Sequence, residues 1–207
     1  MAAKFDEKLA AYRHEQQKEL EQLKFKISSL LDRTTKLHQR EFEVLPEAWA
    51  KLVDAHSATV SVTSPLQSYP DLDNMTFEHL TEFLRKIPLA SWEQDELSRA
   101  SKKTDYFADH IFWRHLNEAR KYCRESHGYL QRNGIFVQAE IKQKFSTMDD
   151  LIWNALTEHE INQRMRLIPR NNEHSNELHS KGEALLKDLE AIVQGRLWSS
   201  ATHLSVD

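Results

Sequence analysis

Apolar side chains recur along the first 45 residues at alternating steps of three and four. From Leu20 onward these steps select Leu20, Leu23, Ile27, Leu30, Thr34, Leu37, Glu41 and Val44. This is the a/d spacing of a coiled coil. An earlier row has the same spacing in a shifted register: Phe5, Leu9, Tyr12 and Gln16. The shift is typical of a stutter, in which four inserted residues locally unwind the supercoil.

Residues 1–45 contain no Gly and no Pro, so the pattern predicts one long helix. At 1.5 Å per residue this helix would be about 65 Å long, which is more than a core of this size requires. We therefore expect part of it to bind a protein partner or a second copy of the chain. The expected contact surface, here named the seam, consists of Leu9, Tyr12, Leu20, Leu23, Ile27, Leu30 and Leu37.

The pattern changes at Pro46, which suits the first turn of a new helix, so we expect a kink or short break there. Polar stretches at 63–75 and 167–176 are predicted loops. Apolar periodicity predicts helices over residues 46–62, 77–86, 92–132, 140–145, 147–165 and 173–198. The last helix again has coiled-coil spacing, and we expect it to lie antiparallel to part of the first.

Local signals predict several helix ends. Thr76 is expected to cap the helix that follows it, and Ser91 with Gln94 forms a capping-box pattern. Asn133 and Gly134 are expected to end the 92–132 helix, because either residue tolerates the left-handed conformation. The inner face of that helix is predicted to hold Leu97, Ala100, Phe107, Ile111, Leu116, Ala119, Cys123 and Leu130.

Composition narrows the fold class. Four Gly and five Pro in 207 residues leave few turn signals, which argues against a β-sandwich or a doubly wound sheet. The sequence therefore predicts an all-α protein, an elongated helical bundle with a long N-terminal coiled-coil helix. Its expected parts are a coiled-coil helix at 1–45, a bundle at 46–198 and a flexible tail at 199–207.

The net charge and the length of the apolar stretches indicate where the protein is located and which partners it does not attract. A net charge of −4 provides no general attraction for nucleic acid or acidic lipid. No stretch approaches the roughly 20 apolar residues of a membrane-spanning helix, and the N-terminus lacks the apolar region of a secretory signal. We therefore expect a cytoplasmic protein that does not bind membranes.

The candidate chemistry centres on Cys123, the single cysteine, which excludes an intramolecular disulfide. His127 follows at i+4 on the same helical face, and Arg120 and Arg124 would lower the pKa of the thiol. A thiol-dependent or ligand-binding pocket could then form beside Trp113 and Trp153. The alternative is that Cys123 is a small apolar residue of the core.

The sequence supports a metal site or a nucleic-acid surface less well than it supports the Cys123 site. No His has a Glu three residues before it, and no His-Glu-x-x-His occurs, so no metal or other cofactor is expected. Asp149 and Asp150 with Glu158-His159-Glu160 are expected to belong to a solvated helix face. A nucleic-acid surface would combine Arg114, Arg120, Lys121, Arg124 and Arg132 with Trp113, Tyr122 and Tyr129, but Glu118 and Glu125 interrupt it.

Three segments resemble a group of bacterial helical proteins with an N-terminal coiled coil and no agreed activity. They are Arg40–Trp49, Asn133–Phe136 and Met148–Trp153. The resemblance implies a bacterial, helical and soluble protein, and it assigns no catalytic residue. The leading hypothesis is a non-enzymatic interaction or scaffold protein that acts through its coiled-coil helix. A small ligand-binding or thiol-dependent enzyme and a nucleic-acid-associated factor are the alternatives.

Overall fold

The computed structural model describes residues 2–87 and 89–198, with side chains from Tyr12 onward. Within these residues the fold is all-α, which confirms the predicted class. The helices are α1 (Ala2–Thr63), α2 (Phe77–Lys86), α3 (Ser91–Arg99), α4 (Lys103–Asn133), α5 (Ala139–Met165), α6 (Glu173–Glu177) and α7 (Glu183–Trp198). A 3-10 turn, Gly134–Phe136, follows α4, and a π-helical turn, Leu178–Gly182, joins α6 to α7. The predicted flexible tail at 199–207 lies outside the described residues.

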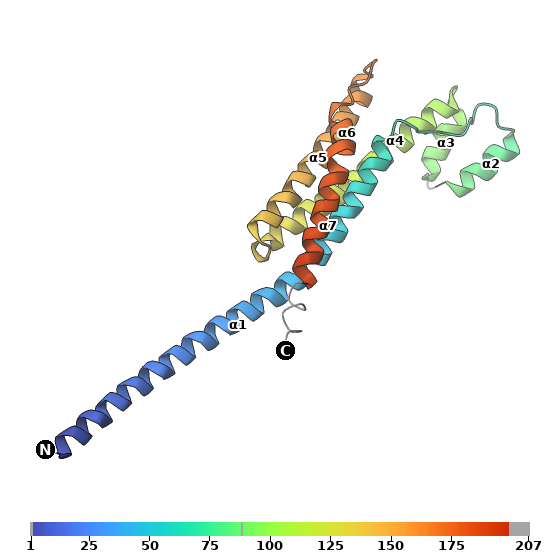
Figure 1. The fold of residues 1–207 in the computed structure, drawn as a ribbon. Helices are drawn as coiled ribbons and strands as arrows, with labels where there is room; N and C mark the ends of the chain where they lie inside the picture. Colours follow the sequence, from blue (N-terminus) through green and yellow to red (C-terminus); the bar gives the residue numbers. More distant parts are fainter. Residues whose placement is uncertain (1, 88, 199–207) are drawn as a thin grey trace.

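Of the kink or short break expected at Pro46, the break does not occur, because helix α1 continues through this residue. A proline inside a helix lacks one N–H donor, but the residues around it are held by burial of Leu45, Ala48 and Leu52. The N-terminal half projects from the bundle, and α1 changes direction where it joins the other helices (Figure 1). The molecule is therefore an elongated rod with a bundle at its C-terminal end.

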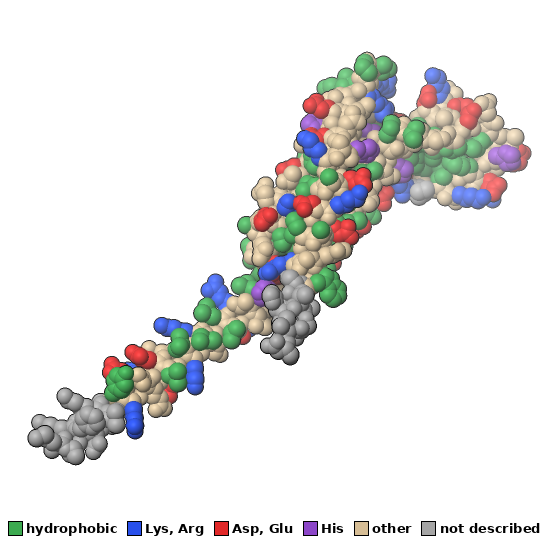
Figure 2. Space-filling view, in the orientation of Figure 1, with side chains coloured by type: hydrophobic (Ala, Val, Ile, Leu, Met, Phe, Trp, Pro, Cys, Tyr) green, Lys and Arg blue, Asp and Glu red, His purple; other side chains and the backbone are tan. Residues whose placement is uncertain are grey.

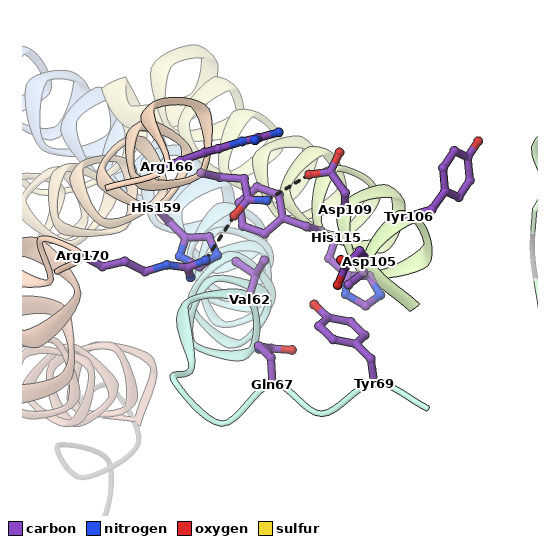
Figure 3. Close-up of a pocket in the computed structure, with 13 residues that line it drawn as sticks. Val62, Gln67, Tyr69, Asp105, Tyr106, Asp109, His115, His159, Arg166 and Arg170 are labelled. Carbon is purple, nitrogen blue, oxygen red and sulfur yellow. Dashed lines mark hydrogen bonds between the residues drawn. The ribbon is translucent and has the colours of Figure 1, made fainter. Parts of the chain in front are cut away.

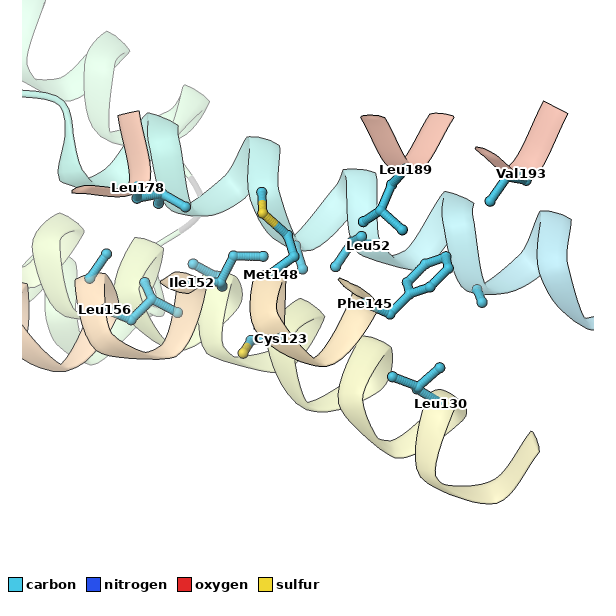
Figure 4. Close-up of a cluster of buried hydrophobic side chains, with 14 of the residues drawn as sticks. Leu52, Cys123, Leu130, Phe145, Met148, Ile152, Leu156, Leu178, Leu189 and Val193 are labelled. Atoms are coloured by element: carbon cyan, nitrogen blue, oxygen red, sulfur yellow. The ribbon is translucent and has the colours of Figure 1, made fainter. Parts of the chain in front are cut away.

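The main core is formed by the second half of α1 together with α4, α5 and α7. Figure 4 shows Leu52 of α1 facing Phe145 and Met148 of α5, with Leu189 of α7 above them. All four are at most 1% exposed. Helix α7 lies along the second half of α1 and runs in the opposite direction, which brings Arg196 to Glu41.

A second, smaller core lies at the far end of the molecule, where α2 and α3 pack against the start of α4 (Figure 1). Its buried members are Leu72, Leu89, Leu97, Phe107 and Ile111. The rings of Tyr69 and Phe83 each make a T-shaped contact with the ring of Phe107. None of the described helices is both long enough and apolar enough to cross a membrane.

The helix predicted over 92–132 is two helices, because α3 ends at Arg99 and α4 begins at Lys103. The start of α4 is capped by a distant loop residue. One carboxylate oxygen of Asp73 accepts the N–H of Lys103 at 2.7 Å, and the other accepts the N–H of Thr104 at 3.2 Å. The Thr104 hydroxyl in turn accepts the N–H of Leu72 at 2.9 Å. This reciprocal cap stabilises a second helix start within the predicted helix.

The predicted caps have mixed outcomes. Thr76 caps α2, since its hydroxyl accepts the N–H of His79. The capping residue of α3 is Ala90 rather than Ser91, and the Glu93 carboxylate accepts the Ala90 N–H at 2.6 Å. Helix α4 ends at Asn133 as predicted, but the next residue has a right-handed φ of −64°, so a left-handed cap is not the cause. The helices predicted at 140–145 and 147–165 are one continuous helix, α5.

Candidate functional site

The seam of α1 remains exposed along the projecting part of the helix. We call residues 12–37 the arm, which is about 38 Å long at 1.5 Å per residue. The described seam residues are between 48% and 62% exposed, namely Tyr12, Leu20, Leu23, Ile27, Leu30 and Leu37. Figure 2 shows green apolar side chains along the rod outside the bundle. Leu9, the remaining seam residue, lies outside the described side chains.

The a/d positions of α1 that follow the seam are covered by other helices from Glu41 onward, where the bundle begins. Arg196, near the end of α7, donates two hydrogen bonds to the Glu41 carboxylate, at 3.0 and 2.9 Å. Glu41 is only 6% exposed, and Val44, the next position of the row, is also buried. The C-terminal helix therefore covers the a/d positions of α1 that follow the C-terminal end of the arm, and none of the described residues from another helix covers the seam of the arm itself.

A first cavity, the Cys123 cavity, lies between α4 and α5 and measures about 540 Å³. It is lined by Cys123, Arg124, His127, Gly128, Asp149, Asp150 and Trp153. The cavity brings together three of the four residues that were predicted to form a pocket. The fourth, Trp113, does not line it, and its ring lies beneath the guanidinium of Arg164 at 5.4 Å.

The thiol of Cys123 is buried and is not activated. Burial raises its pKa to about 12, and the nearby Asp149 carboxylate acts in the same direction. Arg124 and Arg120 oppose this shift, as expected from the sequence, but they do not overcome it. Nucleophilic chemistry requires the thiolate, so this environment favours the interpretation of Cys123 as a core residue.

Asp149 is a buried carboxylate beside the same cavity. The Ser126 hydroxyl donates to its Oδ1 at 3.0 Å, while His127 Nδ1 lies 3.5 Å from Oδ2. Oδ2 has no normal hydrogen bond from the described residues. Burial is the main reason that the pKa of Asp149 is raised. The side chain stabilises the contact between α4 and α5 at the cost of an incompletely satisfied carboxylate.

The expectation of a solvated face on α5 is wrong for Asp149, Glu158 and His159, which are buried, whereas Asp150 is exposed. Glu158 accepts the N–H groups of His174 and Ser175 at 2.9 and 3.0 Å, which caps the start of α6. The periodicity of α5 contains a signal for this outcome. The buried residues Met148, Ile152, Ala155, Leu156 and His159 follow one helical stripe, and extending that stripe would have placed His159 inside.

A second cavity, the His159 cavity, lies between the main core and the smaller core and measures about 530 Å³. Five segments contribute to it: the end of α1, the loop after α1, helix α4, the C-terminal part of α5 and the loop after α5. Figure 3 shows His159 and Val62 at its base, Asp109 and His115 on α4, and Arg170 reaching in toward His159. Sequence reasoning did not identify this site, because no single segment contains its pattern.

His159 is the buried polar group of this cavity. Its ring stacks on Phe112 with centroids 4.8 Å apart. Burial lowers the pKa of His159 to about 4, and the positive charge of Arg170 acts in the same direction. The imidazole is therefore neutral at pH 7.

The basic and aromatic surface considered for nucleic acid is partly neutralised. Arg120 pairs with Glu160, and Arg164 donates to the same carboxylate at 2.7 Å. Lys121 lies 3.9 Å from Glu125. These pairs reduce the positive charge that would face a phosphate backbone.

Among the described side chains, no group of three or more His, Cys, Asp and Glu residues is placed to hold a metal ion. Comparison of the chain with protein-family models, curated proteins and solved structures gives no match. The resemblance to bacterial coiled-coil proteins therefore stays a prediction from the sequence.

Proposed function

We propose that the protein is a non-enzymatic interaction protein whose arm forms a parallel, two-stranded coiled coil with the arm of a second copy. The observation that carries this proposal is the exposure of the seam from Tyr12 to Leu37, next to burial of the same row from Glu41 onward. Large apolar side chains that gather on one exposed face mark interaction surfaces. An isolated helix also gains little stability without packing, so a partner would stabilise the arm.

The residue types in the seam favour two parallel strands. With Leu20 at position a of the heptad, Ile27 also falls at a, and the d positions are Leu23, Leu30 and Leu37. A β-branched residue at a with leucine at d favours parallel dimers. Thr34, a polar residue at a, would favour pairing in register with its own copy, as single polar a positions do in other coiled coils.

The charges flanking the seam fit the same arrangement. In a parallel pair, the g position of one strand faces the next e position of the other, so Glu19 would lie beside Lys24 of the second copy. Lys26 would face Leu31, whose apolar side chain the lysine stem would cover. In an antiparallel pair, g positions face each other, and the register that places Lys26 opposite Lys26 of the second copy would bring two positive charges together, while Glu19 would lie beside Arg33.

The first experiment compares two matched variants of the full chain by sedimentation velocity. Leu30→Lys places a charge at a d position and should abolish the dimer. Phe25→Lys makes a similar change at the outward f position, where Phe25 is 76% exposed, and should leave the dimer intact. Equal association of both variants, or none in the unaltered chain, would contradict the proposal.

A second experiment tests strand direction by disulfide cross-linking. Thr34→Cys at a should form a disulfide between chains under mild oxidation, because in-register parallel strands bring the two positions together. Thr35→Cys, one residue further at the outward b position, is the control and should not cross-link. Cys123 is buried and should take no part. Failure of Thr34→Cys to cross-link in a chain that still dimerises would exclude the parallel arrangement.

A further inference from the structure

The His159 cavity carries two arginines that have no carboxylate partner among the described residues. Arg166 has no ion pair there, and Arg170 donates only to the side-chain carbonyl of Gln163, at 3.2 Å. The acids that line the cavity are already partnered: Asp109 accepts from Gln163 at 2.9 Å, and Asp105 lies 3.6 Å from Lys102. The lining therefore holds two carboxylates and two guanidinium groups, and neither guanidinium is paired with a carboxylate among the described residues.

The two arginines are positioned from one end of the cavity. Both belong to the loop that follows α5, and Arg166 ends that helix in a left-handed conformation with φ of 48°. Non-glycine residues adopt this conformation infrequently, and such residues gather at binding and active sites. In Figure 3, Arg166 extends across the cavity toward the helix that carries Asp109, while Arg170 ends beside His159.

The charge of Arg170 acts on two titratable groups across the cavity. This positive charge contributes to the lowered pKa of His159 and opposes the burial that raises the pKa of Tyr69. His159 and Tyr69 come from α5 and from the loop after α1, so the guanidinium lies at a point where separate segments converge. The volume of about 530 Å³ is within the usual range for small-molecule sites.

We propose that the His159 cavity binds a small anionic molecule, with a phosphate or carboxylate group held by Arg166 and Arg170. A guanidinium donates paired N–H groups that match either oxyanion. The rest of the molecule would lie against Tyr69 and the aromatic ring of Phe112. The neutral imidazole of His159 would offer one donor and one acceptor to polar groups of the ligand. This site is independent of the arm, which lies at the other end of the molecule.

The test is an NMR titration of the full chain that follows the imidazole resonances of His159. Inorganic phosphate, pyrophosphate and citrate are the probes, added at constant ionic strength. We expect a saturable shift, together with a rise in the pKa of His159, because a bound anion offsets the charge of Arg170. Binding by the phosphates alone would assign a phosphate ligand, and binding by citrate alone a carboxylate ligand.

Variants distinguish specific binding of the anion in the His159 cavity from nonspecific attraction to positive charge on the surface. Arg166→Gln and Arg170→Gln should each weaken binding by about tenfold or more, since each removes charged hydrogen bonds. Both residues are exposed, so these changes should leave the fold intact. Arg85→Gln removes the same charge from the surface of α2 and should leave binding unchanged. No saturable shift with any probe, or equal weakening by Arg85→Gln, would overturn the proposal.

Discussion

The two halves of α1 have the same apolar spacing but opposite surroundings. From Glu41 to Thr63, the spaced residues are buried by α4, α5 and α7, whereas from Tyr12 to Leu37 they are exposed. The transition occurs at the Glu41–Arg196 ion pair, where α7 reaches α1. The comparison teaches that periodicity identifies the face of a helix that needs a partner. Whether the partner lies in the same chain depends on the lengths and directions of the other helices.

The largest loss of stability should come from shortening a leucine in the buried half of α1. Leu52 is fully buried, so Leu52→Ala should lower the free energy of unfolding by about 2–5 kcal/mol through lost burial and the cavity left behind. It should not change association of the arms. Urea unfolding monitored by circular dichroism, with sedimentation on the same samples, measures both quantities. A cost below 1 kcal/mol would mean that the bundle is not packed around this residue.

Acidification should lower the free energy of unfolding of the bundle, and the arms of the two copies should stay paired. The pKa of His159 is lowered from 6.5 to about 4, so below pH 6.5 the unfolded chain takes up a proton that the folded chain refuses. Between pH 7 and pH 5 this should remove about 2 kcal/mol from the free energy of unfolding.

His159→Gln is the control for this pH effect, because glutamine does not titrate. The raised pKa of Asp149 acts in the opposite sense, since it favours the folded state as the pH falls, but Asp149 is present in both proteins. The difference in pH dependence between the two proteins therefore isolates His159. Equal pH dependence would show that His159 accepts a proton in the folded state as readily as in the unfolded one.

The boundary between the two halves should depend on the buried ion pair. Glu41→Gln removes the charge that Arg196 contacts and should cost about 1–2 kcal/mol. Amide hydrogen exchange in the last turns of α7 should accelerate, because this contact fixes the end of the helix. Glu43→Gln changes an exposed pair with Arg40 and should cost less than about 0.5 kcal/mol. Similar effects of the two changes would mean that burial does not strengthen the Glu41 contact.

The smallest effect on the bundle should come from the arm. Leu30→Ala should change the unfolding free energy of the dissociated chain by less than about 0.5 kcal/mol, as is usual for exposed positions. The same change should weaken the dimer, so the concentration at which it dissociates should rise. A large loss of stability at high dilution would indicate that Leu30 contacts the bundle in solution.

Much of the fold could be predicted because its signals are local. The Thr76 cap and the burial of Leu97, Leu116 and Cys123 follow from residues close in sequence, and α4 ends at Asn133 as predicted although its cap is not left-handed. The interruption before α4 could not be predicted in this way. Its cap comes from Asp73, 30 residues earlier, so only the tertiary fold reveals it.

The candidate sites differ in the same way, because some have a local sequence signal and one depends on the tertiary fold. The seam and the pair Cys123 and His127 were visible as spacings within one helix, although the burial that raises the pKa of the thiol was not. The His159 cavity needed the assembled fold, because Tyr69, Asp109 and Arg170 are far apart in sequence. Arg170 falls within the predicted 167–176 loop and Arg166 directly precedes it, so neither residue carries a sequence signal for the cavity that it lines.

The central claim is that the exposed half of α1 pairs with its own copy. Sedimentation equilibrium of the unaltered full chain, over a range of concentrations, tests it most directly. A particle of two chains that dissociates reversibly on dilution is the predicted result. A mass of one chain, 24.3 kDa, at every concentration would contradict the claim.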